Sequence, residues 1–333
     1  MQTSTKMLFT FIIIMSNMMI FSSTTWMNMW LAMEMNLMSF IPMMSKPKNS
    51  FISQSMMMYF LTQSMASMMF ITTFLNNNYI SNLFNEEMMN FVIMMIMMMK
   101  MGMPPFHFWF PEIMNKLNWK TCFIMMTWQK MGPIYILSLN LTMNKTLILM
   151  ICISSIFGAI GGLNQTSMRK ILAYSSMNHL AWLMTSASMF KKSWIMYMMI
   201  YSVMLFTLTF MMYNYNIYFL NQMNIFFDKN INKIMITSMM LSLGGLPPFL
   251  GFMPKWMVIQ YMIGSKEFIL MLILVFSSLI SMSYYLRMTS SINMLSYMCQ
   301  KWTMFMKNKN LILMIMFMIN MMLPLVIFSM NMF

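Results

Sequence analysis

Acidic residues are almost missing from this sequence, since Asp and Glu together number six among 333 residues. All charged residues make up 8% of the chain and hydrophobic residues 60%, whereas a soluble domain carries about 25% charged residues. So little charge excludes an ordinary soluble domain and indicates a polytopic membrane protein. The net charge of +14 would suit nucleic-acid binding. However, the basic residues are scattered between apolar runs without a binding motif, which excludes nucleic acid as a partner.

Cysteine is also scarce. The three cysteines, Cys122, Cys152 and Cys299, lie far apart and form no CxxC pair, which argues against an iron–sulfur cluster, a haem or a zinc site. The sequence also has no P-loop, dinucleotide fingerprint or hydrolytic triad. We therefore expect this chain to hold no cofactor and no metal ion.

Methionine, in contrast, is abundant, with 64 residues. Met fills the same apolar volume as Leu or Ile with a more flexible side chain, so its exchange for Ile on a lipid-facing surface should be nearly neutral. The excess therefore resembles drift in a small AT-rich genome that reads AUA as Met, as animal mitochondrial genomes do. A Met-rich metal or partner surface is the alternative, and the even spread of Met along the chain disfavours it.

A helix needs about 20 apolar residues to cross a bilayer. The hydrophobic runs predict about 11 transmembrane helices, and the first is expected to be retained because no cleavage site follows it. Two of the runs are too long for one simple span. The predicted spans are 6–23, 25–44, 52–75, 88–118, 121–141, 146–163, 171–190, 193–214, 231–263, 268–289 and 310–331.

The connecting loops give this arrangement an orientation. If the amino terminus and the even-numbered loops share one side, that side holds most of the Lys and Arg, including Lys6, Arg169, Lys170 and Arg287, whereas the other side holds few, such as Lys191. Basic loops stay inside. We therefore expect the amino terminus on the inner side and the carboxyl terminus on the outer side.

The two long runs contain the same proline-rich motif. Residues 102–111 read GMPPFHFWFP and residues 245–254 read GLPPFLGFMP, so that Gly, Pro, Pro, Phe and the last Pro match in register. Proline removes a backbone donor and clashes with the preceding turn. Helices 4 and 9 are therefore expected to be broken, at residues Pro104, Pro105, Pro247 and Pro248.

Broken helices at matching places in two halves indicate a transport fold built from internal repeats. Helices 4 and 9 are five spans apart, so they should cross the membrane in opposite directions. The predicted fold is one all-α membrane domain, 1–333, with an inverted-topology repeat of two five-helix units, 1–141 and 146–289, and an additional helix over 310–331.

Four ionisable residues lie within the predicted spans: Glu34, Lys100, Lys130 and Lys255. Each charge in mid-membrane costs about 2.5–3.5 kcal/mol, so such residues are usually kept for function. A carboxylate offsets the cost of a desolvated ammonium, so a Glu–Lys pair can hold or release a proton as its surroundings change. The alternatives are a static bridge for Glu34 and Lys100, and for Lys255 a side chain that snorkels to the interface.

Two histidines complete the set of candidates. His179 shares a predicted helix face with Ser175, Trp182 and Ser186, and an imidazole among hydroxyls is suited to proton relay; a hydrogen-bonded core histidine is the alternative. His107 lies inside the first break, where a cap for freed carbonyls is equally reasonable.

Several of these segments occur in order in a known family. The runs 99–109, 127–130, 169–176 and 251–256 resemble subunit 2 of the NADH dehydrogenase of animal mitochondria, one of the antiporter-like membrane-arm subunits of respiratory complex I. Glu34, followed by Asn36, falls at that family's Glu-x-Asn. The resemblance covers nearly the whole chain, and the animal members of the family have eleven helices.

The resemblance implies a subunit of the proton-pumping NADH:ubiquinone reductase of the mitochondrial inner membrane. NADH, FMN, iron–sulfur clusters and ubiquinone would be held by other subunits. Neighbouring antiporter-like and small membrane subunits and lipids such as cardiolipin would be partners. The amino terminus would face the matrix and the carboxyl terminus the intermembrane space.

The resemblance also assigns roles for proton translocation. Glu34 pairs with Lys100, Lys130 is the central lysine, Lys255 leads to the exit, and His179 joins the hydrated axis between them. A signal from quinone chemistry would alter the Glu34–Lys100 pair and shift proton occupancy on Lys130. Two other functions remain open: a stand-alone cation/proton antiporter, and a structural spacer whose buried charges only support assembly.

Overall fold

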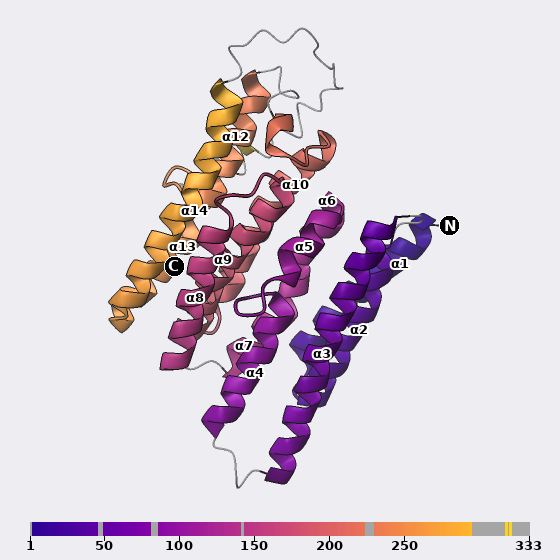
Figure 1. The fold of residues 1–333 in the computed structure, drawn as a ribbon. Helices are drawn as coiled ribbons and strands as arrows, with labels where there is room; N and C mark the ends of the chain where they lie inside the picture. Colours follow the sequence, from indigo (N-terminus) through magenta and orange to yellow (C-terminus); the bar gives the residue numbers. More distant parts are fainter. Residues whose placement is uncertain are drawn as a thin grey trace. The chain divides into compact units, whose positions relative to one another are not determined.

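The computed structural model describes residues 2–45, 49–80, 86–140, 143–223, 230–294, 317–318 and 320–321. The chain divides into two compact units, Met1–Ile153 and Ser154–Phe333, and Figure 1 traces their helices in sequence order. Within the described ranges, regular structure is helical apart from one isolated bridge between Ser167 and Phe219.

The first unit is a set of helices that pack on one another. Helix α1 lies along α2, α3 contacts α2, α4 and α5, and α7 contacts α1, α2, α4 and α6. Helix α7 therefore lies where most of the unit's helices meet. The helices are α1 (Gln2–Ser22), α2 (Trp26–Met44), α3 (Ser50–Ile80), α4 (Glu86–Met101), α5 (Trp109–Lys116), α6 (Trp119–Met126) and α7 (Trp128–Asn140); α8 (Lys145–Gly161) runs across the boundary between the units.

The second unit is arranged around α9, whose residues are nearly all buried and which contacts α10, α13 and α14. A Cβ on Gly158 of α8 would lie 2.7 Å from the backbone nitrogen of Asn178, so glycine permits the close approach of α8 and α9. The helices are α9 (Met168–Met189), α10 (Ser193–Asn214), the short 3-10 helix η1 (Leu220–Gln222), α12 (Asn230–Gly244), α13 (Phe252–Ser265) and α14 (Phe268–Met294).

Each predicted span within the described ranges coincides with helix, and the run 310–331 lies almost wholly outside them. By length and apolarity alone, three described helices could cross a membrane: Ser4–Ser22, Ser193–Asn214 and Phe268–Ile292. The predicted spans 88–118 and 231–263 each comprise two helices joined by the repeated motif. These helices have 16, 8, 15 and 14 residues, and each is shorter than the roughly 20 residues that a transmembrane helix needs.

The first motif ends α4 by a Schellman turn. Gly102 takes a left-handed φ of +70°. The Met103 N–H donates to the Met98 carbonyl at 3.0 Å, and the Gly102 N–H donates to the Met99 carbonyl at 3.3 Å. These two bonds satisfy carbonyls that the end of a helix leaves without partners. The chain then turns into α5, which begins at Trp109.

The second motif ends α12 with the same bonds. Gly245 has a φ of +84°, its N–H donates to the Ser242 carbonyl at 3.0 Å, and the Leu246 N–H donates to the Leu241 carbonyl at 3.4 Å. A further matching bond follows in each motif, from Phe106 to Met103 at 2.9 Å and from Phe249 to Leu246 at 3.0 Å. The matched sequence thus has matched backbone hydrogen bonds in both units.

A further interruption was not predicted from the sequence. The predicted span 121–141 is divided at Thr127 into α6 and α7, with φ −113° and ψ −72° at that residue. The Thr127 hydroxyl donates to the Phe123 carbonyl at 2.8 Å, and the Lys130 N–H donates to the Thr127 carbonyl, three residues back, at 3.2 Å. The second helix therefore starts with a tightened turn just before Lys130.

Candidate functional site

Lys100 lies in the last turn of α4 and is buried. Its carbonyl would normally bond to the N–H of residue 104, which is a proline without that hydrogen; Gln63 of α3 donates its amide instead, at 3.0 Å. The ammonium bonds to the Met33 sulfur at 3.5 Å and interacts electrostatically with Glu34 of α2. Glu34 of α2 and Lys100 of α4 are therefore close enough to interact electrostatically.

Lys130 is 2% exposed in α7. Its ammonium lies over the ring of Phe110, 4.9 Å from the centroid, a position in which an aromatic face attracts a cation. Phe110 belongs to α5 and approaches Gly102 so closely that a Cβ there would be 2.8 Å from the Phe110 Cβ. The glycine of the first motif thus gives room for the ring on which Lys130 rests.

A small polar cavity lies beside Lys100. Its volume of about 20 Å³ exceeds the 10–15 Å³ or so that one water molecule requires. Its walls include uncharged polar residues that were not predicted as site residues. In the sequence, only an amide or phenol within an apolar run marks them. The lining residues are Ile20, Met33, Asn36, Leu37, Tyr59, Gln63, Lys100, Gln129 and Pro133.

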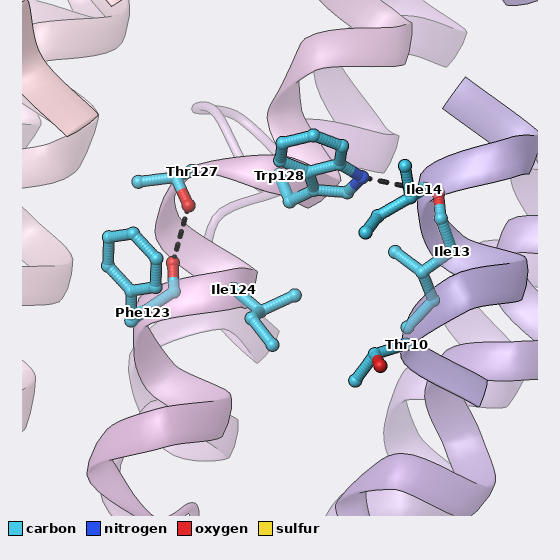
Figure 2. Close-up of a pocket in the computed structure, with 7 residues that line it drawn as sticks. All are labelled: Thr10, Ile13, Ile14, Phe123, Ile124, Thr127 and Trp128. Atoms are coloured by element: carbon cyan, nitrogen blue, oxygen red, sulfur yellow. Dashed lines mark hydrogen bonds between the residues drawn. The ribbon is translucent and has the colours of Figure 1, made fainter. Parts of the chain in front are cut away.

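A second, larger pocket of about 140 Å³ has almost entirely apolar walls from α1, α6 and α7. Figure 2 shows Trp128 at one end, its indole N–H directed at the Ile13 carbonyl at 3.2 Å. The same view shows the Thr127 hydroxyl turned back to Phe123 at the interruption before α7. This bond and the Trp128–Ile13 bond thus hold the α6–α7 junction and join it to α1.

His179 lies in α9 of the second unit and is buried. Its Nδ1 is 3.0 Å from the Tyr197 hydroxyl, and its ring centroid is 4.7 Å from that of Tyr201. One residue away, the Asn178 amide donates to the Ser281 hydroxyl of α14 at 3.1 Å. The surroundings of His179 thus include two tyrosines of α10.

Lys255 lies in the first turn of α13 and is buried, with 6% of its surface exposed. Its ammonium donates to the Gly244 carbonyl at 2.8 Å. That carbonyl would otherwise bond to the N–H of residue 248, which is a proline. Lys255 therefore satisfies a carbonyl that the second motif leaves free.

His107 lies between α4 and α5, with its ring 4.3 Å from that of Phe108, centroid to centroid. Its carbonyl accepts the Phe110 N–H at 3.1 Å. The residue is thus part of the turn that starts α5.

The matching family model, described as NADH:quinone oxidoreductase/Mrp antiporter, TM, covers residues 23–281. The chain belongs to the NADH:quinone oxidoreductase/Mrp antiporter family. Its relatives include the NADH-ubiquinone oxidoreductase chain 2 of Locusta migratoria, 40% identical over 93% of this chain and 91% of that protein. The chain 2 of Anopheles gambiae is 40% identical over 89% and 88%, and that of Metachirus nudicaudatus is 34% identical over 81% and 80%.

Solved structures support the fold of this antiporter-family chain. A chain of respiratory complex I from Thermus thermophilus matches with a TM-score of 0.79 at 17% identity, over 96% of this chain and 79% of that one. A chain of the Mrp complex from Dietzia sp. matches with a TM-score of 0.74 at 12% identity, over 87% and 60%. At such low identity, these likenesses show the fold alone.

In this family member, the predicted site residues are divided between the units. Glu34, Lys100 and Lys130 lie in the first unit, and His179 and Lys255 in the second. Among the residues that the structure describes, no group of three or more His, Cys, Asp or Glu could hold a metal ion.

Proposed function

We propose that this chain is a membrane-arm subunit of a proton-translocating NADH:ubiquinone oxidoreductase of the mitochondrial inner membrane. The observation that carries the proposal is its likeness, over nearly the whole chain, to animal proteins named NADH-ubiquinone oxidoreductase chain 2. Three buried lysines in apolar helices agree with it, because ionisable groups at membrane depth usually mark ion or proton paths. The chain is thus part of an enzyme and contributes proton transfer.

The electron-transfer chemistry belongs to partner subunits in this proposal. NADH, FMN, iron–sulfur clusters and ubiquinone are held there, and a signal from quinone chemistry reaches this chain through its neighbours. Moving one charge against the membrane potential costs about 2.3 kcal/mol per 100 mV, and electron transfer in the partners supplies this energy. Neighbouring antiporter-like and small membrane subunits, together with cardiolipin, cover its apolar outer surface.

The proton path that we propose begins at the Glu34–Lys100 pair. Weakening of that pair changes the charge held at Lys100 and shifts proton occupancy to Lys130, where the Phe110 ring can stabilise an ammonium. The proton leaves by way of Lys255, and His179 belongs to the hydrated axis between them. The electrostatic interaction of Glu34 with Lys100 supports the first step.

The test is Lys130→Met in the assembled complex, because Met fills similar volume without a charge. Protons translocated per NADH oxidised are measured in proteoliposomes, with Lys120→Met, an exposed lysine in neighbouring α6, as the control. We expect Lys130→Met to lower this ratio without reducing assembly, and the control to leave it unchanged. An unchanged ratio in Lys130→Met would refute the role of the central lysine and favour a structural spacer.

We further propose that residues 1–141 and 146–289 form an inverted-topology repeat in the membrane. The matched hydrogen bonds at Gly102 and Gly245 support a repeat, and the asymmetric distribution of basic loops supports opposite orientations. The amino terminus then faces the matrix, and the carboxyl terminus faces the intermembrane space. A stand-alone antiporter is less favoured, because the likeness to the Mrp chain is limited to fold at 12% identity.

A further inference from the structure

Neutral side chains form an uninterrupted row of hydrogen bonds in the first unit. The Tyr59 hydroxyl donates to Gln129 Oε1 at 3.2 Å, and Gln129 Nε2 donates to Asn36 Oδ1 at 2.9 Å. Asn36 Nδ2 then donates to Asn17 Oδ1 at 3.4 Å, and Asn17 Nδ2 donates to the Trp128 carbonyl at 3.0 Å. Each side chain donates a hydrogen bond to the next group along the row, so the bonds polarise one another.

The row holds the first turn of α7 at two points. One point is the Gln129 side chain and the other is the Trp128 carbonyl, and the next residue is Lys130. Asn17 and Asn36 belong to α1 and α2, so the turn that carries Lys130 is tied to two other helices. A change at Gln129 would therefore reach the backbone of Lys130 directly.

The other end of the row opens into the cavity beside Lys100, because Tyr59 and Gln129 both line it. The Tyr59 ring is held between Phe40, at 5.2 Å between centroids, and Trp109, at 6.2 Å. With the ring fixed, rotation of the hydroxyl hydrogen is the movement left to Tyr59. When that hydrogen points at Gln129, the oxygen lone pairs remain available to a donor in the cavity.

Lys100 needs such an acceptor. A lysine ammonium carries three donors, and its hydrogen bond to the Met33 thioether is to a weak acceptor. The cavity that it shares with Tyr59 has room for about one water molecule. A water there can accept from the ammonium and donate to the Tyr59 oxygen.

We propose that Tyr59 and Gln129 are positioning residues that transmit the charge state of Lys100 to the turn carrying Lys130, through one water bound in this cavity. A charged Lys100 donates to the water, the water donates to the Tyr59 oxygen, and the hydroxyl hydrogen stays on Gln129. A neutral Lys100 accepts from the water instead. The Tyr59 hydrogen then turns into the cavity to donate to the water, and Gln129 is released.

The inference rests on the proposed function of Lys100 and Lys130 in proton translocation. Its test is Tyr59→Phe in the assembled complex, which removes the hydroxyl and keeps the ring. The control is Tyr135→Phe. Tyr135 lies in α7 and is half-buried, and its hydroxyl donates to the Phe21 carbonyl over the same 3.2 Å distance.

We expect Tyr59→Phe to slow proton translocation about tenfold, in keeping with the loss of a buried hydrogen bond, while electron transfer from NADH under uncoupled conditions and assembly stay unchanged. Tyr135→Phe should leave all three unchanged. An infrared difference spectrum between coupled and resting states should lose a water O–H band, identified by its ¹⁸O shift, in Tyr59→Phe.

A double-mutant cycle separates transmission from packing. If Tyr59 acts through Lys100, Tyr59→Phe has no further effect in a Lys100→Met complex, whereas independent structural effects add. Additive losses, equal losses in Tyr135→Phe, or a parallel fall in assembly would each overturn the inference. If Tyr59→Phe pumps normally while Lys130→Met does not, only the role of Tyr59 and Gln129 is overturned. If Lys130→Met pumps normally, the proposed function is overturned.

Discussion

A lysine is retained in an apolar helix for chemistry or for structure, and the three buried lysines differ in this respect. Lys255 donates to the Gly244 carbonyl that Pro248 leaves without a backbone donor, so it completes the second motif. Lys130 lies against an aromatic ring, and Lys100 bonds to a thioether. These contacts differ from that of Lys255, whose ammonium bonds to a backbone carbonyl of the motif.

The two roles of Lys255 can be separated by substitution. Lys255→Gln keeps a donor for the Gly244 carbonyl without a charge, whereas Lys255→Met leaves that carbonyl without this donor at a cost of about 1–3 kcal/mol. We expect both variants to lower proton pumping and only Lys255→Met to lower the thermal stability of the complex. Normal pumping in Lys255→Gln would show that Lys255 has the structural role alone.

The glycines of the two motifs should resist substitution. Gly102→Ala and Gly245→Ala place a Cβ on a left-handed backbone, which costs about 1–3 kcal/mol, and the new Cβ would lie 2.8 Å from Phe110 Cβ or 2.9 Å from Lys255 Nζ. We expect both to reduce the amount of assembled complex on native gels. Gly264→Ala is the control, because nothing lies within 4 Å of its added Cβ.

The charged residues of the site were predictable from the sequence because a charge in an apolar run is rare and costly. Asn36, Tyr59 and Gln129 were not selected, since a neutral amide or phenol within a span is less conspicuous. Their importance depends on partners far away in sequence, such as Gln129 and Asn36 at 2.9 Å. Only the packing of α2, α3 and α7 brings these groups together.

The interruptions of helices differ in whether residues close in sequence are enough to cause them. Gly followed by two prolines within three residues predicts the ends of α4 and α12, because glycine takes the left-handed turn and proline removes the next donors. The interruption at Thr127 has neither residue at its position. It depends on the Thr127 hydroxyl bond to Phe123, four residues back, and on the bond of Trp128 to Ile13 of α1. The second of these joins residues far apart in sequence.

The attachment of α7 to α1 gives a prediction for this element. Trp128→Phe removes the indole N–H that bonds to the Ile13 carbonyl and should destabilise the packing of α1 on α7 by about 1 kcal/mol. Hydrogen exchange of α1 amides would then increase. Trp30→Phe is the control, because the Trp30 indole nitrogen makes no hydrogen bond. Equal exchange in the two variants would contradict the role of the Trp128–Ile13 bond.

For the whole molecule, the proposed inverted-topology repeat predicts the direction in which each helix crosses the membrane. Helix α9 has 22 residues and is therefore about 33 Å long, enough to cross the hydrocarbon core of a bilayer. Its ends carry Arg169 and Lys170 on one side and Lys191 and Lys192 on the other. Under the basic-loop rule, we propose that the first end faces the matrix, because the other loops predicted on that side are also basic.

Thiol labelling can test this orientation on both sides of α9. Asn164→Cys and Lys192→Cys lie at exposed positions on either side of the helix and are compared in a Cys152→Ser background, because Cys152 is only half-buried. An impermeant maleimide added to mitoplasts should label Lys192→Cys and should label Asn164→Cys only after the membrane is permeabilised. The reverse pattern would place α9 in the opposite orientation. Labelling of both sites in intact mitoplasts would mean that α9 does not cross the membrane, and the inverted-topology repeat would then have to be abandoned.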